Sequence, residues 1–82
     1  MKKIVVIIPA YNEEKTISDT ISGLFSIKPE LNKFGYELKI HLINDGSTDS
    51  TGNLASKHQE VFVITHKKNR GLGAAVRTGL LS

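Results

Sequence analysis

The stretch of this sequence with the richest chemical possibilities is Ile43–Asp49, which reads INDGSTD. Asp45 supplies a carboxylate that could accept a hydrogen bond from an N–H group at the edge of a nucleobase. Gly46 allows backbone conformations that are costly for other residues, and the three residues after it are all types that cap helices. Two interpretations follow: a ligand-binding loop, or a capped turn that holds no ligand.

Four further side chains could complete a site for a base and a ribose. Tyr11 offers a flat face for stacking together with a hydroxyl group. Glu13 could accept hydrogen bonds from sugar hydroxyls, although it also fits an acidic residue in the first turn of a helix. Arg70 and Arg77 could contact a phosphate or a base carbonyl, and each could equally be a solvated charge on a helix.

Other kinds of site find little support in the sequence. There is no cysteine, no Ser–His pair at a recognisable spacing, and no D-x-D or H-x-x-x-H cluster for a metal. His41 fits a strand side chain on a partly covered face better than a metal ligand. The glycines that typify dinucleotide-binding and P-loops are missing, since PAYNEE follows the first apolar run. Gly71 and Gly73 could let a phosphate approach a helix N-terminus, but tight helix–sheet packing is the preferred interpretation.

Three apolar runs predict the strands that must position these groups. Lys3–Ile8 is apolar on both faces after its first residue, which is typical of a buried parallel strand, and we expect Pro9 to stop it. Tyr36–Ile43 and Val61–Thr65 predict the second and third strands.

Helical patterns separate the three runs. The first helix is expected to have Asn12 as its N-cap and to end at Lys28-Pro29, followed by a polar connection over residues 30–36. A short second helix is expected from about Ser50. The third covers Gly71–Leu81. The apolar stripes that should face the sheet are Ile17, Ile21, Leu24 and Phe25 in the first helix, and Leu72, Val76 and Leu80 in the third.

The predicted order β-α-β-α-β-α places all three strand ends at one edge of the sheet. Helical crossovers return each strand in the same direction, so the fold class is a three-layer, Rossmann-like α/β arrangement with a parallel three-stranded sheet. Residues 9–13, 44–49 and 66–73 then converge at the carboxyl edge, where open α/β sheets bind ligands. This convergence favours a binding site over a simple capped turn.

Composition limits the partners of this 82-residue chain, which is long enough for one small domain. Its net charge of +3 lies in residues 59–82, which hold four basic residues and one acid. No aromatic residues alternate with these charges, so we expect no nucleic-acid partner. The apolar run after Lys2 and Lys3 is too short to span a membrane or to serve as a signal peptide. The lack of cysteine is compatible with a reducing compartment.

Three ordered motifs, VVIIPAYNEEKTI, INDGSTDST and NRGLGAAVRTGL, cover almost the whole chain. Together they resemble the N-terminal part of a family 2 glycosyltransferase of the GT-A fold, and the dolichyl-phosphate and polyprenyl-phosphate sugar synthases have the most similar pattern. The family's D-D-G-S-x-D hallmark has Asn44 here in place of its first acid. Its second acid, which contacts the nucleotide base in related synthases, is retained as Asp45.

The resemblance implies a nucleotide-sugar donor, a UDP- or GDP-sugar, and an acceptor such as polyprenyl or dolichyl phosphate. By the same match the nucleotide-binding residues would be Pro9, Tyr11, Glu13, Ile43, Asp45 and Arg77. In the family a later D-x-D motif holds a divalent metal, Mg²⁺ or Mn²⁺, and the catalytic base comes later still. We therefore expect residues 1–82 to be a truncated nucleotide-binding part of a cytoplasmic enzyme, one that could associate with the cytoplasmic face of a membrane. The isolated chain should bind no metal, contain no catalytic residue and be inactive.

An alternative stays open: a stand-alone Rossmann-like module that binds nucleotide or RNA without catalysis. A D-x-D motif shortly after residue 82 in the parent reading frame would decide for the enzyme. We also expect self-association through strand one. If no fourth strand covers Ile4–Ile8, that apolar edge is free to pair with a second copy in an antiparallel dimer. The competing outcome is a monomer whose last helix slides over the edge.

Overall fold

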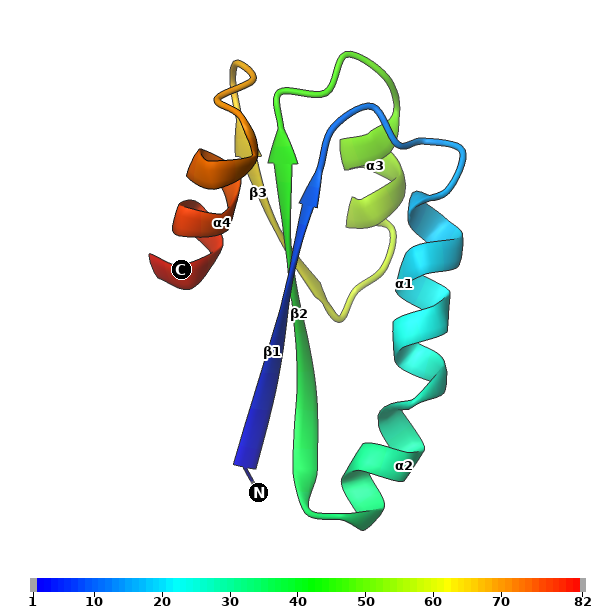
Figure 1. Ribbon diagram of the computed structural model, residues 1–82. Helices are drawn as coiled ribbons and strands as arrows, with labels where there is room; N and C mark the ends of the chain where they lie inside the picture. The colour runs from blue at the N-terminus through cyan, green and yellow to red at the C-terminus, as the bar shows by residue number, and fades with distance from the viewer. Residues whose placement is uncertain (1, 82) are drawn as a thin grey trace.

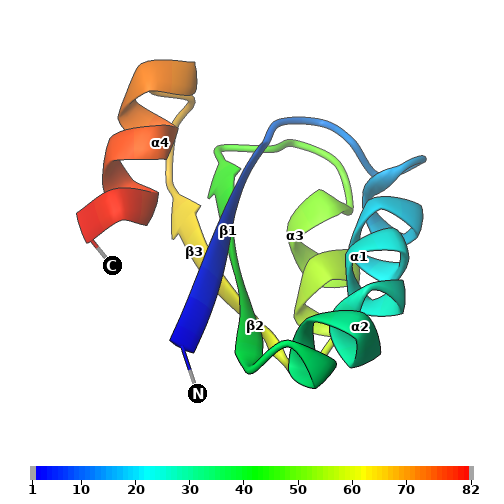
Figure 2. The same cartoon turned by 60° about the horizontal axis from the view of Figure 1, so that its bottom comes forward.

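The computed structural model describes residues 2–81 and has a single parallel sheet with helices on both of its faces (Figure 1). The helices α1, α2 and α3 cover one face, and α4 lies on the other (Figure 2). This arrangement confirms the predicted three-layer α/β fold. The elements in chain order are β1 (Lys2–Ala10), α1 (Ile17–Ser26), α2 (Lys28–Lys33), β2 (Tyr36–Asp45), α3 (Thr51–Ser56), β3 (Val61–His66) and α4 (Leu72–Leu81).

The sheet has the strand order β1-β2-β3, so β2 is central and both neighbours run parallel to it. The register pairs Ala10 with Asn44, and Asn44 with Thr65. The three strands therefore end at the same edge, at the top of Figure 1, where their following loops lie close together. We call this carboxyl edge the rim.

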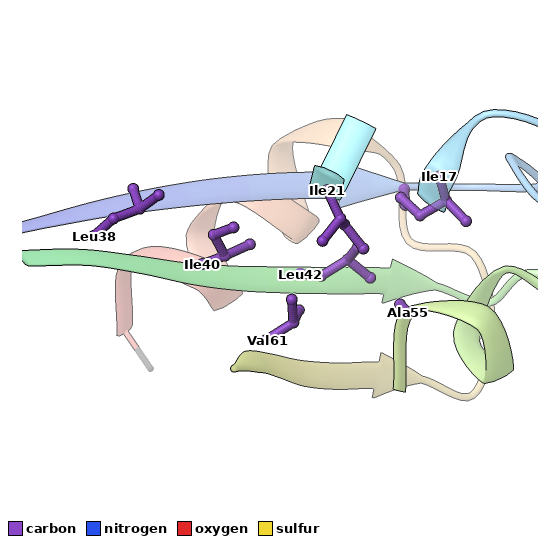
Figure 3. Close-up of a cluster of buried hydrophobic side chains, with 8 residues drawn as sticks. Ile17, Ile21, Leu38, Ile40, Leu42, Ala55 and Val61 are labelled. Carbon is purple, nitrogen blue, oxygen red and sulfur yellow. The ribbon is translucent and has the colours of Figure 1, made fainter. Parts of the chain in front are cut away.

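The core lies between the sheet and the α1–α3 layer (Figure 3). Ile17 and Ile21 of α1 are buried there, with Leu24 and Phe25 partly buried beside them, so the predicted stripe of the first helix is confirmed. A fully buried aliphatic side chain of this size contributes about 1.5–3 kcal/mol before entropy is subtracted. The sheet and α3 contribute Ala10, Leu38, Ile40, Leu42, Ala55 and Val61.

The strands are longer than the sequence predicted. Pro9 was expected to stop the first strand, but β1 continues through it to Ala10. A proline is tolerated there because β1 is an edge strand in the sheet that the described residues form, where a missing N–H need not break a ladder bond. The second and third strands also extend to Asp45 and His66, so these two residues are held by the sheet and not by loops.

Two predictions about the first helical segment are wrong. Asn12 is not the N-cap, because α1 begins at Ile17 and Asn12 has the left-handed φ of 51°. Residues 28–33 form the short helix α2 in place of a polar connection. Pro29 does separate the two helices, but it also sits in the first turn of α2, where its missing N–H costs no hydrogen bond.

The predicted contact face of the third helix is also wrong. The stripe Leu72, Val76 and Leu80 points outward, and Leu80 is 70% exposed, whereas Ala75 and Gly79 are buried. The reason is the close approach of α4 to β1: a Cβ atom at Gly79 would collide with the Cγ2 of Ile7. The helix therefore packs against the sheet with its small residues, and its larger apolar residues stay exposed.

Candidate functional site

The loop after β1 is fastened to the loop after β2 through Asn12. Its backbone N–H donates to the Oγ of Ser47 at 3.0 Å, and its Oδ1 accepts from the N–H of Thr48 at 2.8 Å. Asparagine tolerates the left-handed conformation that this geometry requires better than most residues do. Ser47 and Thr48 therefore hold the first loop and do not cap a helix.

The next two residues of the first loop make similar bonds. The N–H of Glu13 donates to the Oγ1 of Thr51 at 2.8 Å, and the N–H of Glu14 donates to Asp49 at 3.2 Å. Burial opposes the ionisation of Asp49, but hydrogen bonds from Thr51 and from the Glu14 N–H outweigh it and lower the pKa of Asp49. The polar residues that follow Asp45 thus form a frame for the first loop, a role that needs no ligand.

Asp45 holds the third loop, the one that follows β3. Its buried carboxylate accepts hydrogen bonds from the backbone N–H groups of Arg70 and Gly71, each at 2.9 Å. The Arg70 N–H, and next the side chain of His66, lower the pKa of Asp45 by stabilising its charged form. Gly46, with φ of 70°, makes this approach possible, because a Cβ there would collide with the backbone of Lys68 and Asn69.

His66 is the functional candidate that the sequence analysis missed. Its Nδ1 lies 2.8 Å from the Oδ1 of Asp45, and its Nε2 lies 2.8 Å from the Oγ1 of Thr78 in α4. The ring is buried, although the sequence suggested only a loop residue. The sequence does contain one hint of a partner for His66. The small residues Ala75 and Gly79 and the polar Thr78 are spaced so that they share one face of α4.

A cavity of about 260 Å³ opens at the rim between the first loop and the start of α4. We call it the rim pocket. Its lining residues are Pro9, Ala10, Tyr11, Glu13, Asp45, Asn69, Gly71, Leu72 and Ala75. The fold thus brings together four of the six residues predicted to bind nucleotide, namely Pro9, Tyr11, Glu13 and Asp45. Of the other two, Ile43 is fully buried and Arg77 is exposed on α4, and neither lines the pocket.

Gly71 and Gly73 do not serve the tight helix–sheet packing that the sequence analysis preferred. A Cβ at either position would have no atom within 4 Å. Gly71 is required by its φ of 90°, and Gly73 borders open space in the first turn of α4. The start of α4 is therefore accessible to a ligand that occupies the rim pocket.

A larger hollow of about 560 Å³ lies on the amino-terminal half of the sheet, away from the rim. Val5, Phe62 and His41 form part of its wall, with Lys3 and Lys39 beside them. The rings of His41 and Phe62 are tilted against each other at 5.3 Å, in keeping with a strand side chain on a partly covered face. We prefer the rim pocket as the site because the polar loops converge there.

Two features are absent from residues 2–81 of this chain. Nowhere in this part of the chain do three or more His, Cys, Asp or Glu side chains gather in a way that could hold a metal ion. None of its helices is long and apolar enough to cross a membrane.

The chain is similar to known proteins in sequence and in fold. The family model described as Glycosyl transferase family 2 matches residues 5–81. The chain is 42% identical over 78 residues to an uncharacterized protein of Methanocaldococcus jannaschii. It is 36% identical over 91 residues to the dolichyl-phosphate beta-glucosyltransferase of Homo sapiens. These alignments cover 95% and 99% of this chain but 28% of each relative, so the chain spans little more than a quarter of their length.

One solved structure with a similar fold is a mannosyltransferase from Pyrobaculum calidifontis in complex with GDP-Man and Mn²⁺. It matches with a TM-score of 0.75 and 24% sequence identity, over 94% of this chain and 23% of its own. At this level of identity the likeness concerns the fold. It confirms the predicted fold class, the N-terminal Rossmann-like part of a GT-A fold.

Proposed function

Because this chain belongs to glycosyl transferase family 2, we propose that its rim pocket holds the nucleotide of a UDP- or GDP-sugar donor. The observation that carries the proposal is the set of hydrogen bonds that the Asp45 carboxylate accepts. An ionised carboxylate offers about four acceptor positions. Three of those of Asp45 are occupied, by the N–H groups of Arg70 and Gly71 and by the ring of His66. Asp45 lines the rim pocket, so the remaining position on Oδ2 is available to an N–H at the edge of a base.

The other walls of the pocket fit the remaining parts of a nucleoside diphosphate. Tyr11 lines the pocket and is 46% exposed, so its ring can stack on a base. Glu13, held by its backbone N–H, can accept from ribose hydroxyls. At the start of α4, Gly71 lines the pocket, and the open space beside Gly73 leaves room for a phosphate group. Contacts of Ile43 and Arg77 with the nucleotide stay predictions.

The proposal extends to the whole enzyme of which this chain would form the nucleotide-binding part. That enzyme would transfer a sugar to an acceptor such as polyprenyl or dolichyl phosphate, in the cytoplasm or at the cytoplasmic face of a membrane. Similarity to dolichyl-phosphate beta-glucosyltransferases supports the acceptor class. A divalent metal, Mg²⁺ or Mn²⁺, would neutralise the leaving diphosphate. Residues 2–81 hold no group of three or more His, Cys, Asp or Glu side chains that could bind a metal ion, so ligands from elsewhere in the enzyme would be needed.

The proposal is tested by calorimetry of the 82-residue chain with UDP and with GDP, with and without Mg²⁺. We expect weak binding that does not require the metal. Tyr11→Ala should weaken it about tenfold through lost stacking. Phe34→Ala is the matched control, because Phe34 is 77% exposed and does not line the pocket. No binding by the wild type at millimolar nucleotide, or equal binding by Tyr11→Ala, would contradict the proposal. Sugar transfer by the isolated chain should be undetectable with Mg²⁺ or Mn²⁺.

A second candidate function is a nucleotide- or RNA-binding module without catalysis. Lys67, Lys68 and Arg70 in the third loop are all exposed, which favours contact with phosphates. Fluorescence anisotropy with single-stranded RNA separates the two candidates. Tight, steeply salt-dependent binding of RNA together with weak binding of UDP and GDP would favour the module, and the reverse would favour the donor site.

A further inference from the structure

Three side chains form a continuous hydrogen-bonded line from the rim pocket to the outer helix layer. Asp45 ends β2, His66 ends β3 directly beside it in the register, and Thr78 lies on α4. The two links, Asp45–His66 and His66–Thr78, are both 2.8 Å long, and His66 is 6% exposed. Neither His66 nor Thr78 lines the rim pocket, so any effect on a ligand must pass through Asp45 or α4.

The chemistry of these groups gives the line a direction. The carboxylate of Asp45 can only accept, so Nδ1 of His66 must carry the proton that it donates. In the neutral ring Nε2 is then the acceptor, and the hydroxyl of Thr78 donates to it. Asp45 thereby fixes the tautomer, Thr78 helps to fix the plane of the imidazole, and the imidazole fixes one side of the carboxylate.

The line also connects two walls of the pocket. Oδ1 of Asp45 accepts from His66 and from Arg70, whereas Oδ2 accepts from Gly71 alone. Without the His66 bond the carboxylate would be held by the N–H groups of Arg70 and Gly71 alone, and Oδ1 would lose one of its two donors. Thr78 belongs to α4, and the same helix contributes Leu72 and Ala75 to the pocket. One imidazole therefore contributes both to the orientation of the carboxylate and to the position of α4, the helical wall of the pocket.

We propose that His66, together with Thr78, is a positioning residue that aims the free acceptor of Asp45 at the base of the bound nucleotide. This inference rests on the proposed function. Its competitor is a purely structural role, in which His66 only attaches α4 to the sheet. The two roles differ in which ring nitrogen matters: positioning depends on Nδ1 and Asp45, whereas attachment depends equally on Nε2 and Thr78.

Two pairs of variants separate these roles in the 82-residue chain. His66→Asn keeps an N–H near the place of Nδ1, and His66→Gln keeps a polar group near the place of Nε2 but loses the donor to Asp45. Thr78→Val removes the hydroxyl with little change of shape, and Thr78→Ser keeps it as the control. Calorimetry with UDP and GDP gives affinities, thermal unfolding gives midpoints, and ¹⁵N NMR of the wild-type imidazole reports its tautomer.

We expect His66→Gln to weaken nucleotide binding about tenfold, Thr78→Val about threefold, and His66→Asn and Thr78→Ser by less than about twofold. The unfolding midpoints of the Asn and Gln variants should be alike, and the wild-type proton should lie on Nδ1. Equal affinities for the Asn and Gln variants, or a proton on Nε2 of the wild type, would overturn the positioning role of His66 but not the proposed function. A wild type that binds neither nucleotide would overturn the proposed function and this inference with it.

Discussion

The two walls of the rim pocket are held in different ways. The first wall, the loop after β1, is fastened by hydrogen bonds from three successive residues, Asn12, Glu13 and Glu14, to the loop after β2 and the start of α3. The second wall, the loop after β3 and the start of α4, depends on one carboxylate, Asp45, which accepts from two backbone N–H groups and from His66.

This difference has a consequence for how each wall responds to change. Several hydrogen bonds hold the first wall together; most are neutral, with a net contribution of about 0.5–1.5 kcal/mol each, and one is accepted by the Asp49 carboxylate. The second wall has a single charged centre that is also the proposed contact to the base. A substitution at that centre should therefore affect the shape of the pocket and the ligand together, whereas the first wall should weaken gradually.

The largest expected effect is that of Asp45→Ala. The N–H groups of Arg70 and Gly71 would lose their acceptor, and the base would lose its partner. We expect nucleotide binding to fall about a hundredfold or more, below detection by calorimetry, and amide exchange to accelerate at both residues. Glu60→Ala is the control, because it removes an exposed carboxylate paired with Lys28 far from the pocket. Equal binding by wild type and Asp45→Ala would remove Asp45 from the site.

Gly79→Ala in α4 should lower the free energy of unfolding, whereas the matched change Gly23→Ala in α1 should raise it. A Cβ at Gly79 meets the stiff, β-branched Ile7, so overpacking of about 1–3 kcal/mol should exceed the gain in helix propensity of about 1 kcal/mol. Gly23→Ala in α1 meets no atom within 4 Å and should stabilise the chain by about 0.5–1 kcal/mol. Urea unfolding measures both. Stabilisation by Gly79→Ala would show that α4 does not pack closely on β1.

Nucleotide binding should tolerate Thr51→Val in the first wall better than Asp45→Ala in the second. The hydroxyl of buried Thr51 accepts from the Glu13 N–H, so its loss should cost about 1–2 kcal/mol of unfolding free energy. Nucleotide affinity should fall by less than about fivefold, since the other bonds of the first loop remain. Thr20→Val serves as the control, because Thr20 is exposed and its hydroxyl donates to the carbonyl of Thr16, the residue just before α1. A loss of binding as large as that of Asp45→Ala would erase the proposed contrast between the walls.

The smallest effect on the pocket is expected from Val5→Lys, which tests the edge that carries the first wall. In the sheet of the described residues β1 is an edge strand, and we propose that the 82-residue chain self-associates through it. Val5 is 48% exposed, so a lysine there should leave the fold intact, whereas Val6 packs against the core. Sedimentation should show a wild-type dimer and a Val5→Lys monomer with unchanged nucleotide affinity. A wild-type monomer, or a dimer indifferent to the charge, would contradict pairing through β1.

Much of the fold could be predicted because hydrophobic periodicity reports directly on burial. The three apolar runs became the strands, and the stripe that begins with Ile17 and Ile21 faces the core. Periodicity failed for α4, where the distance between helix and sheet, set by Gly79 against Ile7, decided which face is buried. It also missed α2, because Pro29 fits the first turn of a helix as well as it ends one.

The site was predictable to the extent that it depends on topology. Parallel strands with aligned ends had to bring Tyr11, Glu13 and Asp45 to one edge, and the rim pocket contains all three. The buried partners of Asp45 could not be predicted in the same way. The His66 and Thr78 bonds depend on the exact placement of α4, and the bonds to Arg70 and Gly71 depend on loop backbone geometry that no residue pattern encodes.

The central claim, that the rim pocket and not the larger hollow binds nucleotide, is tested most directly by NMR. The ¹⁵N-labelled chain is titrated with UDP and then with GDP, and its backbone amide shifts are followed. We predict the largest changes at Tyr11, Arg70 and Gly71, with Lys39 and Phe62 in the larger hollow unaffected. Changes centred on Lys39 and Phe62, or no change at millimolar nucleotide, would contradict the account.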